Sequence, residues 1–322
     1  MKIVMYSYRE DEIDFINEFS KKYNIQIQLC KESPSLENTS LAKDALCISI
    51  ITTKMSKELI RKFYDMGVRY ISTRTIGYDH IDVEGAKEIG MAFGNVKYSP
   101  NSVAEYTVMM IIMALRNMNL ILTRYNSQDY ALNGIRGQEL AKLTVGIIGT
   151  GNIGTKVIKK LSGFETDIIA YDLYENDEVK KYASYVSLEE LYRKSDVISL
   201  HLPATDQSFH MIDKAAIETM KDGVIIINTA RGSLINTSEL ISALKSGKVK
   251  GAALDVIEGE ELIYYQDFKG EIVDNSNLAI LQSFPNVILT PHTAFYTDKV
   301  VSDMVENSII NCKEFMEKFH IK

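Results

Sequence analysis

The sequence lacks tryptophan, and its 322 residues include only five prolines and three cysteines. The cysteines, Cys30, Cys47 and Cys312, are odd in number, widely spaced and set among apolar neighbours. That spacing predicts no disulfide framework, and no CxxC or Cys/His pattern indicates a metal site. We therefore expect three reduced thiols in the core and no metal cofactor.

Long hydrophobic runs are also absent. The most apolar stretch, "VMMIIMAL" at residues 108–115, is far shorter than the roughly 20 residues that span a bilayer. The first residues, "MKIVMYSYRED", hold too short an apolar stretch for a signal peptide. We therefore expect a soluble, cytoplasmic protein without a membrane partner.

The sequence has fewer positively charged than negatively charged residues. The 36 lysines and arginines are outnumbered by 43 aspartates and glutamates, which gives a net charge of -7 and a pI near 5.4. No run of lysine or arginine forms the basic face that a nucleic acid or an anionic membrane surface requires. The composition therefore disfavours nucleic acids as partners.

The chain is longer than one hydrophobic core usually serves, so two domains are predicted. Its first ninety-odd residues alternate strand-like and helix-like segments, as in a small α/β unit. Strands are predicted at residues 2–8, 25–29, 45–51 and 68–73, and helices at residues 10–22 and 57–67.

A long apolar helix is predicted next. Pro100 interrupts the pattern, and Ser102 followed by Glu105 forms a capping box that begins a helix reaching about Leu122. This segment is apolar nearly all round, so it must be buried on more than one side. A core helix or a subunit interface is the interpretation.

From Leu143 the alternation of strands and helices becomes regular. Six strands, most of them separated by helical segments, are typical of a doubly wound dinucleotide-binding sheet. The last helix, predicted at about residues 296–318, is expected to return to the first domain and make it discontinuous. The six strands are predicted at residues 143–148, 167–171, 196–200, 224–228, 251–255 and 286–290.

A glycine motif follows the first of these strands. In "VGIIGTGNIG", Gly149, Gly151 and Gly154 have the GxGxxG spacing between a buried strand and a helix, which favours a pyrophosphate at the helix N-terminus. Asp172 ends the next strand, where a carboxylate accepts both ribose hydroxyls and repels a 2′-phosphate. NAD is therefore favoured over NADP. A structural glycine turn and a solvated aspartate are the alternatives.

Three ionisable residues follow the last three strands. Arg231, Glu260 and His292 each come just after a buried strand, and the carboxyl ends of parallel strands line the ligand crevice. Arginine binds a carboxylate at two points. Histidine suits proton transfer near neutral pH, and a paired carboxylate stabilises its protonated form. The set predicts reduction of a 2-keto acid, whereas a surface arginine and a structural histidine are the alternatives. His201 is expected to border the cofactor, and His210 is interpreted as a surface residue.

With these residues named, the sequence resembles the D-specific 2-hydroxyacid dehydrogenase family over essentially its full length. Within that family it is similar to the D-lactate dehydrogenase branch, particularly the vancomycin-resistance type. The matching stretches are "STRTIGYDHID", "GNVKYSPNSVAEYT", "VGIIGTGNIG", "INTARGSLINTSELISALKSGKVKGAALDVIEGE" and "PNVILTPHTAFYT".

The resemblance implies an α/β fold of two Rossmann-like domains, each a doubly wound parallel sheet, with the active site in the cleft between them. Residues 1–98 with 296–322 would form the substrate-binding domain and residues 99–295 the NAD-binding domain. A homodimer would be built on the helix at residues 101–122.

The resemblance also assigns roles to residues. Arg231, Glu260 and His292 resemble the family's catalytic residues, and Asp255 resembles the group that orients the cofactor's carboxamide. Further cofactor-contacting positions are matched by Asn152, Ile153, Pro203, Thr229 and Ala230. Substrate-binding positions are matched by the backbone of Ile76 and Gly77 and by the rings of Tyr98 and Tyr296.

These inferences predict NAD-dependent, reversible reduction of a small 2-keto acid, pyruvate first, to the D-hydroxy acid, with His292 as acid and base. The segment at residues 262–281 resembles an insertion of the lactate-type branch. Leu173 stands where the family often has proline. The alternatives are a dehydrogenase of bulkier 2-keto acids of the hydroxyisocaproate type, a formate- or phosphite-type dehydrogenase, and a non-catalytic NAD-sensing binding protein. The intact Arg/Glu/His set disfavours the last.

Overall fold

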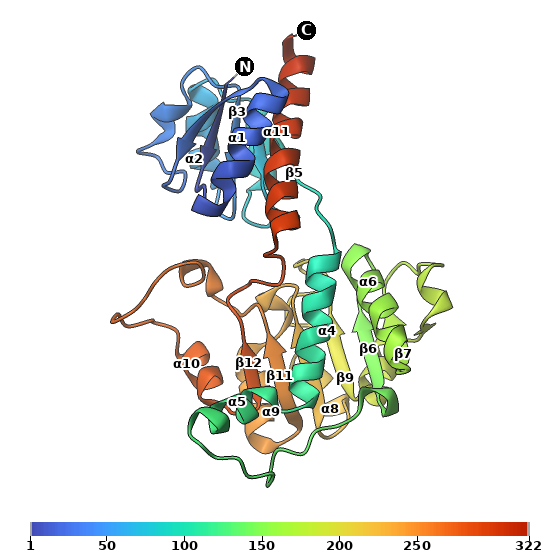
Figure 1. Ribbon diagram of the computed structural model, residues 1–322. Helices are drawn as coiled ribbons and strands as arrows, with labels where there is room; N and C mark the ends of the chain where they lie inside the picture. The colour runs from blue at the N-terminus through green and yellow to red at the C-terminus, as the bar shows by residue number, and fades with distance from the viewer. Residues whose placement is uncertain (1, 321–322) are drawn as a thin grey trace. The chain divides into compact units, whose positions relative to one another are not determined.

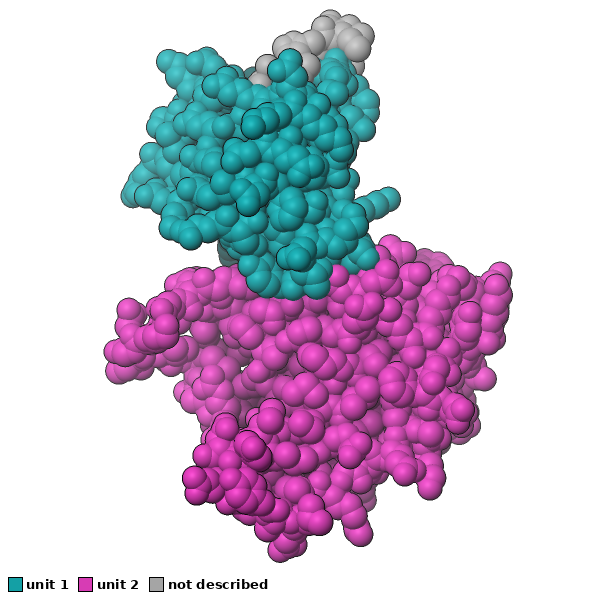
Figure 2. Space-filling model, in the orientation of Figure 1, with its two compact units in different colours: residues 1–99, 296–322 teal, residues 100–295 magenta. Residues whose placement is uncertain are grey.

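The computed structural model describes residues 2–320 and divides the chain into two compact units (Figure 2). Unit 1 comprises Met1–Ser99 and Tyr296–Lys322, and unit 2 comprises Pro100–Phe295. The first boundary lies one residue later than the sequence predicts. Each unit is a parallel sheet with helices on both faces, so the predicted α/β class with two Rossmann-like domains is confirmed.

Unit 1 contains a five-stranded parallel sheet in the order β2-β1-β3-β4-β5. The four predicted strands are present, but β5 and α3 were missed. β5 was missed because its sequence, "AFGN", lacks the β-branched residues that indicate a strand. The strands are β1 Lys2–Tyr6, β2 Gln26–Cys30, β3 Cys47–Ile50, β4 Tyr70–Thr73 and β5 Ala92–Asn95. The helices are α1 Ile13–Tyr23, α2 Lys57–Asp65, α3 Val83–Ile89 and α11 Asp298–His320.

Side chains of unit 1 pack on both faces of its sheet, since successive residues of a strand point to opposite sides. Ile3 and Met5 of β1 pack in one core cluster with α1 and with Val305 and Ile309 of α11. Val4 of β1 belongs to the other cluster, which α2 and α3 complete. The three cysteines are free and buried, as predicted.

Unit 2 contains a seven-stranded parallel sheet in the order β12-β11-β10-β9-β6-β7-β8 (Figure 1). All six predicted strands are present, and the seventh, β8, was missed because it has only two residues. The strands are β6 Thr144–Ile148, β7 Asp167–Tyr171, β8 Ser184–Tyr185, β9 Val197–Leu200, β10 Val224–Asn228, β11 Val249–Leu254 and β12 Val287–Leu289.

Helices cover both faces of this sheet. One core cluster places α4 and α6 on one face, and another places α7, α8, α9 and α10 on the opposite face. The helices are α4 Asn101–Leu115, α5 Met118–Asn126, α6 Asn152–Leu161, α7 Leu188–Lys194, α8 Lys214–Thr219, α9 Thr237–Ser246 and α10 Ser276–Ser283. Short 3-10 turns lie at Glu10–Glu12, Thr39–Ala42, Leu140–Lys142, Ser162–Phe164, Val179–Lys181, Gly232–Leu234 and Glu260–Leu262.

The prediction of one helix from about residue 102 to Leu122 was wrong. Asn117 adopts a left-handed conformation with φ of 53°, and the chain bends by 68° between α4 and α5. Pro100 occupies the N-cap position of α4, so Ser102 lies inside the first turn of the helix and not at its N-cap as predicted. Glu105 instead accepts a 2.8 Å hydrogen bond from Lys160 of α6. Within residues 2–320 no single helix is long and apolar enough to cross a membrane, although α4 and α5 pass that test as a bent pair.

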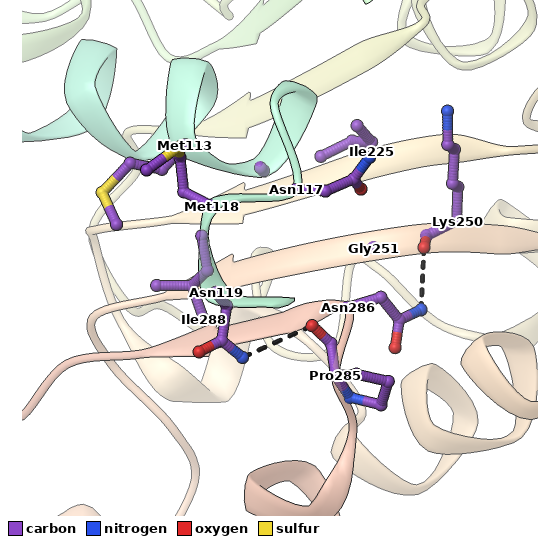
Figure 3. A pocket seen from close by; sticks show the side chains of 11 residues that line it. Met113, Asn117, Met118, Asn119, Ile225, Lys250, Gly251, Pro285, Asn286 and Ile288 are labelled. Atoms are coloured by element: carbon purple, nitrogen blue, oxygen red, sulfur yellow. Dashed lines mark hydrogen bonds between the residues drawn. The ribbon is translucent and has the colours of Figure 1, made fainter. Parts of the chain in front are cut away.

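The break between α4 and α5 lies beside a small pocket at the amino ends of β10, β11 and β12 (Figure 3). Asn119 donates a 2.8 Å hydrogen bond to the carbonyl of Val287, and Asn286 donates one of 2.7 Å to the carbonyl of Lys250. The first bond fastens α5 to the sheet, and the second ties the residue before β12 to β11. The pocket therefore lies at the edge of the sheet opposite to the predicted site, which follows the carboxyl ends of the strands.

Strand order locates the ligand-binding edge of unit 2. β6 pairs with β7 on one side and with β9 on the other, so the chain changes direction across the sheet at β6. In open α/β sheets ligands bind outside the carboxyl ends of the strands at this point. The glycine motif follows β6 directly.

Candidate active site

The glycine loop after β6 has the shape that a pyrophosphate needs. A Cβ on Gly149, whose φ is 97°, would lie 2.5 Å from the carbonyl oxygen of His201, and one on Gly154 would lie 1.9 Å from the carbonyl oxygen of Gly149. Only glycine fits at either position. A Cβ on Gly151 would meet nothing within 4 Å, and α6 begins at Asn152 with Gly151 as its N-cap. Open space thus lies before free N–H groups at a helix N-terminus, which fits the phosphates of NAD.

Asp172 lies at the end of β7 and faces this loop. Its Oδ2 accepts hydrogen bonds from the N–H of Thr150 at 2.6 Å and from Oγ1 of Thr150 at 3.1 Å, and its Oδ1 accepts one from the N–H of Tyr174 at 3.1 Å. The carboxylate is therefore fixed beside the glycine loop. Each oxygen has more than one acceptor site, and the contact with the ribose stays a prediction.

His201 lies beneath the glycine loop. Its Cβ is 3.5 Å from the place of a Cβ on Gly154, and its Nε2 lies 2.9 Å from Oγ of Ser199. Burial lowers the pKa of His201 to about 3, so the ring is neutral at physiological pH. Its position fits the prediction that it borders the cofactor, and a neutral imidazole leaves the phosphate site without a positive charge from this residue.

The other predicted cofactor positions surround the same edge. Thr229 and Ala230 follow β10, where Oγ1 of Thr229 lies 2.8 Å from Oγ1 of Thr107 in α4 and the N–H of Ala230 donates to Asn228 at 3.0 Å. The side chain of Thr229 thus fastens α4 to the sheet. Asn152 and Ile153 form the first turn of α6, and Pro203 is exposed in the loop after β9. Their contacts with NAD stay predictions.

His292 and Glu260 form a hydrogen-bonded pair. Nδ1 of His292 lies 2.6 Å from Oε1 of Glu260, with 26% and 15% of the two side chains exposed. Oε2 of Glu260 accepts a 2.7 Å hydrogen bond from the N–H of Ile257. An acceptor at Nδ1 fixes the tautomer, so Nε2 is the nitrogen that remains to exchange a proton with a ligand.

Asp255 holds the turn that carries His292. It is fully buried at the end of β11, and its Oδ1 accepts hydrogen bonds from Oγ1 of Thr290 at 2.5 Å and from the N–H of Thr293 at 2.9 Å. Its Oδ2 accepts one from the N–H of Ala294 at 2.9 Å. This anchoring was not predicted from the sequence, and the predicted contact with the carboxamide of the cofactor stays a prediction. The anchored turn holds His292 at a φ of 53°.

Arg231 follows β10 at the same edge of the sheet. β10, β11 and β12 are neighbours, so Arg231, Glu260 and His292 follow three adjacent parallel strands. Nη1 of Arg231 donates a 2.7 Å hydrogen bond to the carbonyl of Ala230. A Cβ on Gly232 would lie 2.2 Å from the carbonyl carbon of Ile257. The loops that carry Arg231 and Glu260 are therefore in direct backbone contact.

Two aromatic rings lie beside His292, and the sequence analysis missed both. The ring centroids of Tyr265 and Phe295 each lie 6.2 Å from that of His292. The hydroxyl of Tyr265 donates a 2.9 Å hydrogen bond to the carbonyl of His292, and its φ is 68°. Tyr265 belongs to the insertion at residues 262–281, whose aromatic content was the available signal.

The predicted substrate residues of unit 1 lie after β4, after β5 and before α11. Asn95 donates to the carbonyl of Ile76 at 2.5 Å, and Oγ1 of Thr75 donates to the carbonyl of Gly77 at 2.6 Å. Among residues 2–320 the N–H groups of Ile76 and Gly77 donate no hydrogen bond, so both are available for a carboxylate.

Tyr98 and Tyr296 differ in exposure. Tyr98 is half-buried after β5, whereas Tyr296 is 49% exposed and donates a 2.8 Å hydrogen bond to Oδ2 of Asp11. That hydrogen bond raises the pKa of Tyr296 above its usual value. Their predicted roles in binding substrate are not tested by these contacts.

A second histidine–carboxylate pair lies in unit 2. Nε2 of His210 is 2.6 Å from Oε1 of Glu258, so the interpretation of His210 as a plain surface residue was incomplete. The signal was weak, because a lone histidine 48 residues from a glutamate indicates no pairing.

A dinucleotide-binding sheet with a histidine–carboxylate pair and an arginine at its carboxyl edge defines an NAD-dependent oxidoreductase. Residues 108–294 match the family model for the D-isomer specific 2-hydroxyacid dehydrogenase NAD binding domain. The chain is 46% identical to an aromatic 2-oxoacid reductase of Clostridium sporogenes, over 98% of this chain and 96% of that protein. It is 41% identical to a D-specific alpha-keto acid dehydrogenase of Enterococcus faecium, over 97% of this chain and 96% of that protein.

Solved structures agree with these relatives. A D-lactate dehydrogenase of Treponema pallidum matches with a TM-score of 0.88 and 33% identity, over 99% of this chain and 97% of that one. The chain therefore belongs to the D-isomer specific 2-hydroxyacid dehydrogenases and is an enzyme that uses NAD.

Proposed function

We propose that this enzyme reduces a 2-keto acid to the D-2-hydroxy acid with NADH, reversibly, and that His292 is its acid and base. The observation that carries the proposal is the 2.6 Å contact between Nδ1 of His292 and Glu260, which leaves Nε2 for the substrate oxygen. When bound, NADH supplies the hydride. In reduction, Nε2 gives its proton to the carbonyl oxygen of the substrate, and in oxidation it takes the hydroxyl proton back.

Glu260 stabilises the imidazolium that reduction requires. The carboxylate is largely buried and accepts the Nδ1–H group, so its charge faces the ring across a short, weakly screened distance. Histidine without such a partner in a closed site tends to lose its proton. Glu260 is therefore proposed to orient the ring of His292 and to stabilise the charge that the ring carries when it acts as an acid.

Arg231 is proposed to hold the substrate carboxylate. A guanidinium stays charged at every accessible pH and binds a carboxylate through two parallel hydrogen bonds. Within unit 1, the unoccupied N–H groups of Ile76 and Gly77 are donors of the kind that a carboxylate accepts. A carboxylate is thus the substrate group for which the chain has dedicated donors.

We propose that the enzyme prefers a 2-keto acid with an aromatic side chain over one with an aliphatic side chain. Pyruvate was the substrate expected from the sequence, and the D-lactate dehydrogenase of Treponema pallidum supports it. The aromatic 2-oxoacid reductase is the more similar relative, at 46% identity. Tyr265 and Phe295, both 6.2 Å from the ring of His292, supply aromatic surface beside the reacting group.

A panel of 2-keto acids with NADH tests both parts of the proposal. We expect NADH consumption with phenylpyruvate at a higher kcat/KM than with 4-methyl-2-oxopentanoate or pyruvate, and D product by chiral chromatography. The matched variant H292Q should lose activity with every keto acid and keep its affinity for NADH in a fluorescence titration. No turnover of any keto acid contradicts the proposal and leaves an NAD-binding protein without this activity, and L product contradicts the proposed stereochemistry. A preference for pyruvate contradicts only the aromatic ranking.

The homodimer through residues 101–122 stays a prediction, which analytical ultracentrifugation would test.

A further inference from the structure

We infer that Glu258 and His210 form a positioning pair that holds Glu260 and the loop of Arg231 in place for reaction. The inference rests on the proposed 2-keto acid reduction. Neither residue is placed to act on substrate through the contacts described above. Their role follows from the segments that they join, which are the loops after β9, β10 and β11. These three parallel strands all end at the edge of the sheet that carries the candidate site.

The side chain of Glu258 accepts three hydrogen bonds, one from His210 and two from Thr237. Its Oε1 lies 2.6 Å from Nε2 of His210, and its Oε2 accepts from the N–H of Thr237 at 2.9 Å and from Oγ1 of Thr237 at 2.6 Å. Burial raises the pKa of Glu258, but the hydrogen bonds from His210 and Thr237 outweigh burial, so its net pKa lies below the usual value. The side chain is therefore a carboxylate at neutral pH, fixed by donors from two different segments.

A helix-capping role accounts for only part of this arrangement. Thr237 is the first residue of α9, but Asn236 already occupies the N-cap position and accepts a 3.2 Å hydrogen bond from the N–H of Glu239. Glu258 accepts the N–H of Thr237, another donor of the same helix end, but its other oxygen is bonded to His210, which lies outside the helix. What the contact contributes is a connection between α9 and the loop that contains Glu260.

His210 connects the same carboxylate to the loop that follows Arg231. The N–H of His210 donates a 2.8 Å hydrogen bond to the carbonyl of Ser233, and Ile212 pairs with Ile235 as a parallel bridge. His210 has a φ of 50°, which a non-glycine residue adopts at some cost. The turn thus directs Nε2 towards Glu258 while its backbone is bonded to the segment after Arg231.

Glu258 lies close to Glu260 along the chain. The N–H of Ile257, the residue before Glu258, donates to Oε2 of Glu260 at 2.7 Å. Gly259, between the two glutamates, has a φ of 75°, so the chain turns sharply there. Gly232 packs against the peptide that joins Ile257 to Glu258, where a Cβ would lie 2.6 Å from the nitrogen of Glu258. A displacement of Glu258 therefore moves the N–H group that orients Glu260.

The test compares E258Q, H210A and H210Q with a matched control, E189Q. Glu189 is an exposed residue of α7 that pairs with Arg193 at 3.8 Å, so its replacement removes a charge of the same unit away from the site. We expect E258Q and H210A to lose about 10- to 100-fold in kcat/KM for the keto acid, the effect of a small misplacement of catalytic groups. H210Q should recover much of the loss, because its amide can donate to Glu258 as Nε2 does. E189Q should be unchanged.

The pH profile separates positioning from simple stabilisation. Among residues 2–320, the titratable side chains that the structure places against the ring of His292 are Glu260 and Tyr265. In E258Q and H210A, a poorly oriented Glu260 should shift the high-pH limb of keto acid reduction to lower pH, in the direction that E260Q shifts it. A lower Tm with an unmoved limb, or an H210Q variant no better than H210A, overturns the inference.

A measurement without catalysis separates this inference from the proposed function. The chain has five histidines, so the ring resonances can be assigned by replacing each in turn. In nitrogen-15 spectra we expect the titration of the His292 ring to move to lower pH in E258Q and to stay in place in E189Q. If the wild type reduces no 2-keto acid, the proposed function fails while this shift can still be measured. If the wild type is active and the His292 titration of E258Q matches that of the wild type, the positioning role fails alone.

Discussion

Replacing Glu260 by glutamine removes the charge that faces His292 and keeps nearly the same side-chain size. Glu260 accepts one N–H group with each oxygen, from His292 at 2.6 Å and from Ile257 at 2.7 Å. Glutamine has a single acceptor oxygen, so it can satisfy only one of these donors. E260Q therefore removes the charge and one of two hydrogen bonds.

The size of the effect follows from the distance and the exposure of the pair. Two unit charges about 4 Å apart attract each other by about 4 kcal/mol at an effective dielectric constant of about 20. The side chains of His292 and Glu260 are 26% and 15% exposed, and water at a partly exposed pair reduces the attraction to about 1 to 2 kcal/mol. Since about 1.4 kcal/mol corresponds to a factor of ten, the loss of this attraction should lower kcat/KM for reduction about tenfold.

The assay is kcat/KM against pH in both directions. Reduction requires the imidazolium, so in E260Q the descending limb at high pH should move to lower pH. Oxidation of the D-hydroxy acid requires the neutral ring, and its rising limb should move in the same direction. E260D, which keeps the charge at a greater distance from the ring, should show a smaller shift. If neither limb moves in a folded E260Q protein, Glu260 does not stabilise the protonated form of His292, and the proposed mechanism is wrong at that step.

Three further predictions concern the anion sites and stability. R231K should lower kcat/KM for the keto acid by about 100-fold, the loss of about 3 kcal/mol from a two-point charged contact, while NADH affinity holds; near-normal activity would show that the guanidinium does not bind the carboxylate. D172A should narrow the ratio of kcat/KM for NADH over NADPH, because the carboxylate that repels a 2′-phosphate is gone, and an unchanged ratio would count against the assignment. His201, with its pKa lowered to about 3, binds a proton in the unfolded chain below about pH 6.5 but not in the folded one. Stability should therefore fall as pH decreases from 6.5 towards 3, with a gentler fall in H201Q by urea unfolding, and equal slopes would refute the burial of a neutral ring.

The sequence predicted the elements whose pattern is strongest. Four consecutive β-branched residues, Val224 to Ile227, indicate a strand buried on both faces, and β10 is buried throughout. The elements it missed are those without a pattern: β8 has two residues, and β5 contains Gly94 and Asn95. The break at Asn117 was missed because one left-handed residue interrupts a helix without changing the apolar composition around it.

The sequence predicted which residues of the candidate site follow the carboxyl ends of neighbouring strands. Arg231, Glu260 and His292 follow adjacent strands, and strand order carries that information. The pairing of Glu260 with His292 was predicted, but the atoms that meet, Nδ1 and Oε1, were not, because they depend on a turn that Asp255 anchors and on side-chain directions that spacing does not encode. The pair of His210 and Glu258 could not be predicted for the same reason, since 48 residues separate them.

The discontinuous build of unit 1 has a consequence during synthesis on the ribosome. Ile3, Met5 and Cys47 form an apolar face that α11 covers, and α11 begins only at Asp298. At about 5–20 residues per second, the ribosome takes roughly 10 to 40 s to make the intervening unit 2. Until the last helix emerges, the nascent chain therefore exposes this apolar face to solvent, and an exposed apolar face promotes aggregation. A stop codon in place of Asp298 would leave every predicted site residue in the chain, yet this apolar face of unit 1 would stay uncovered.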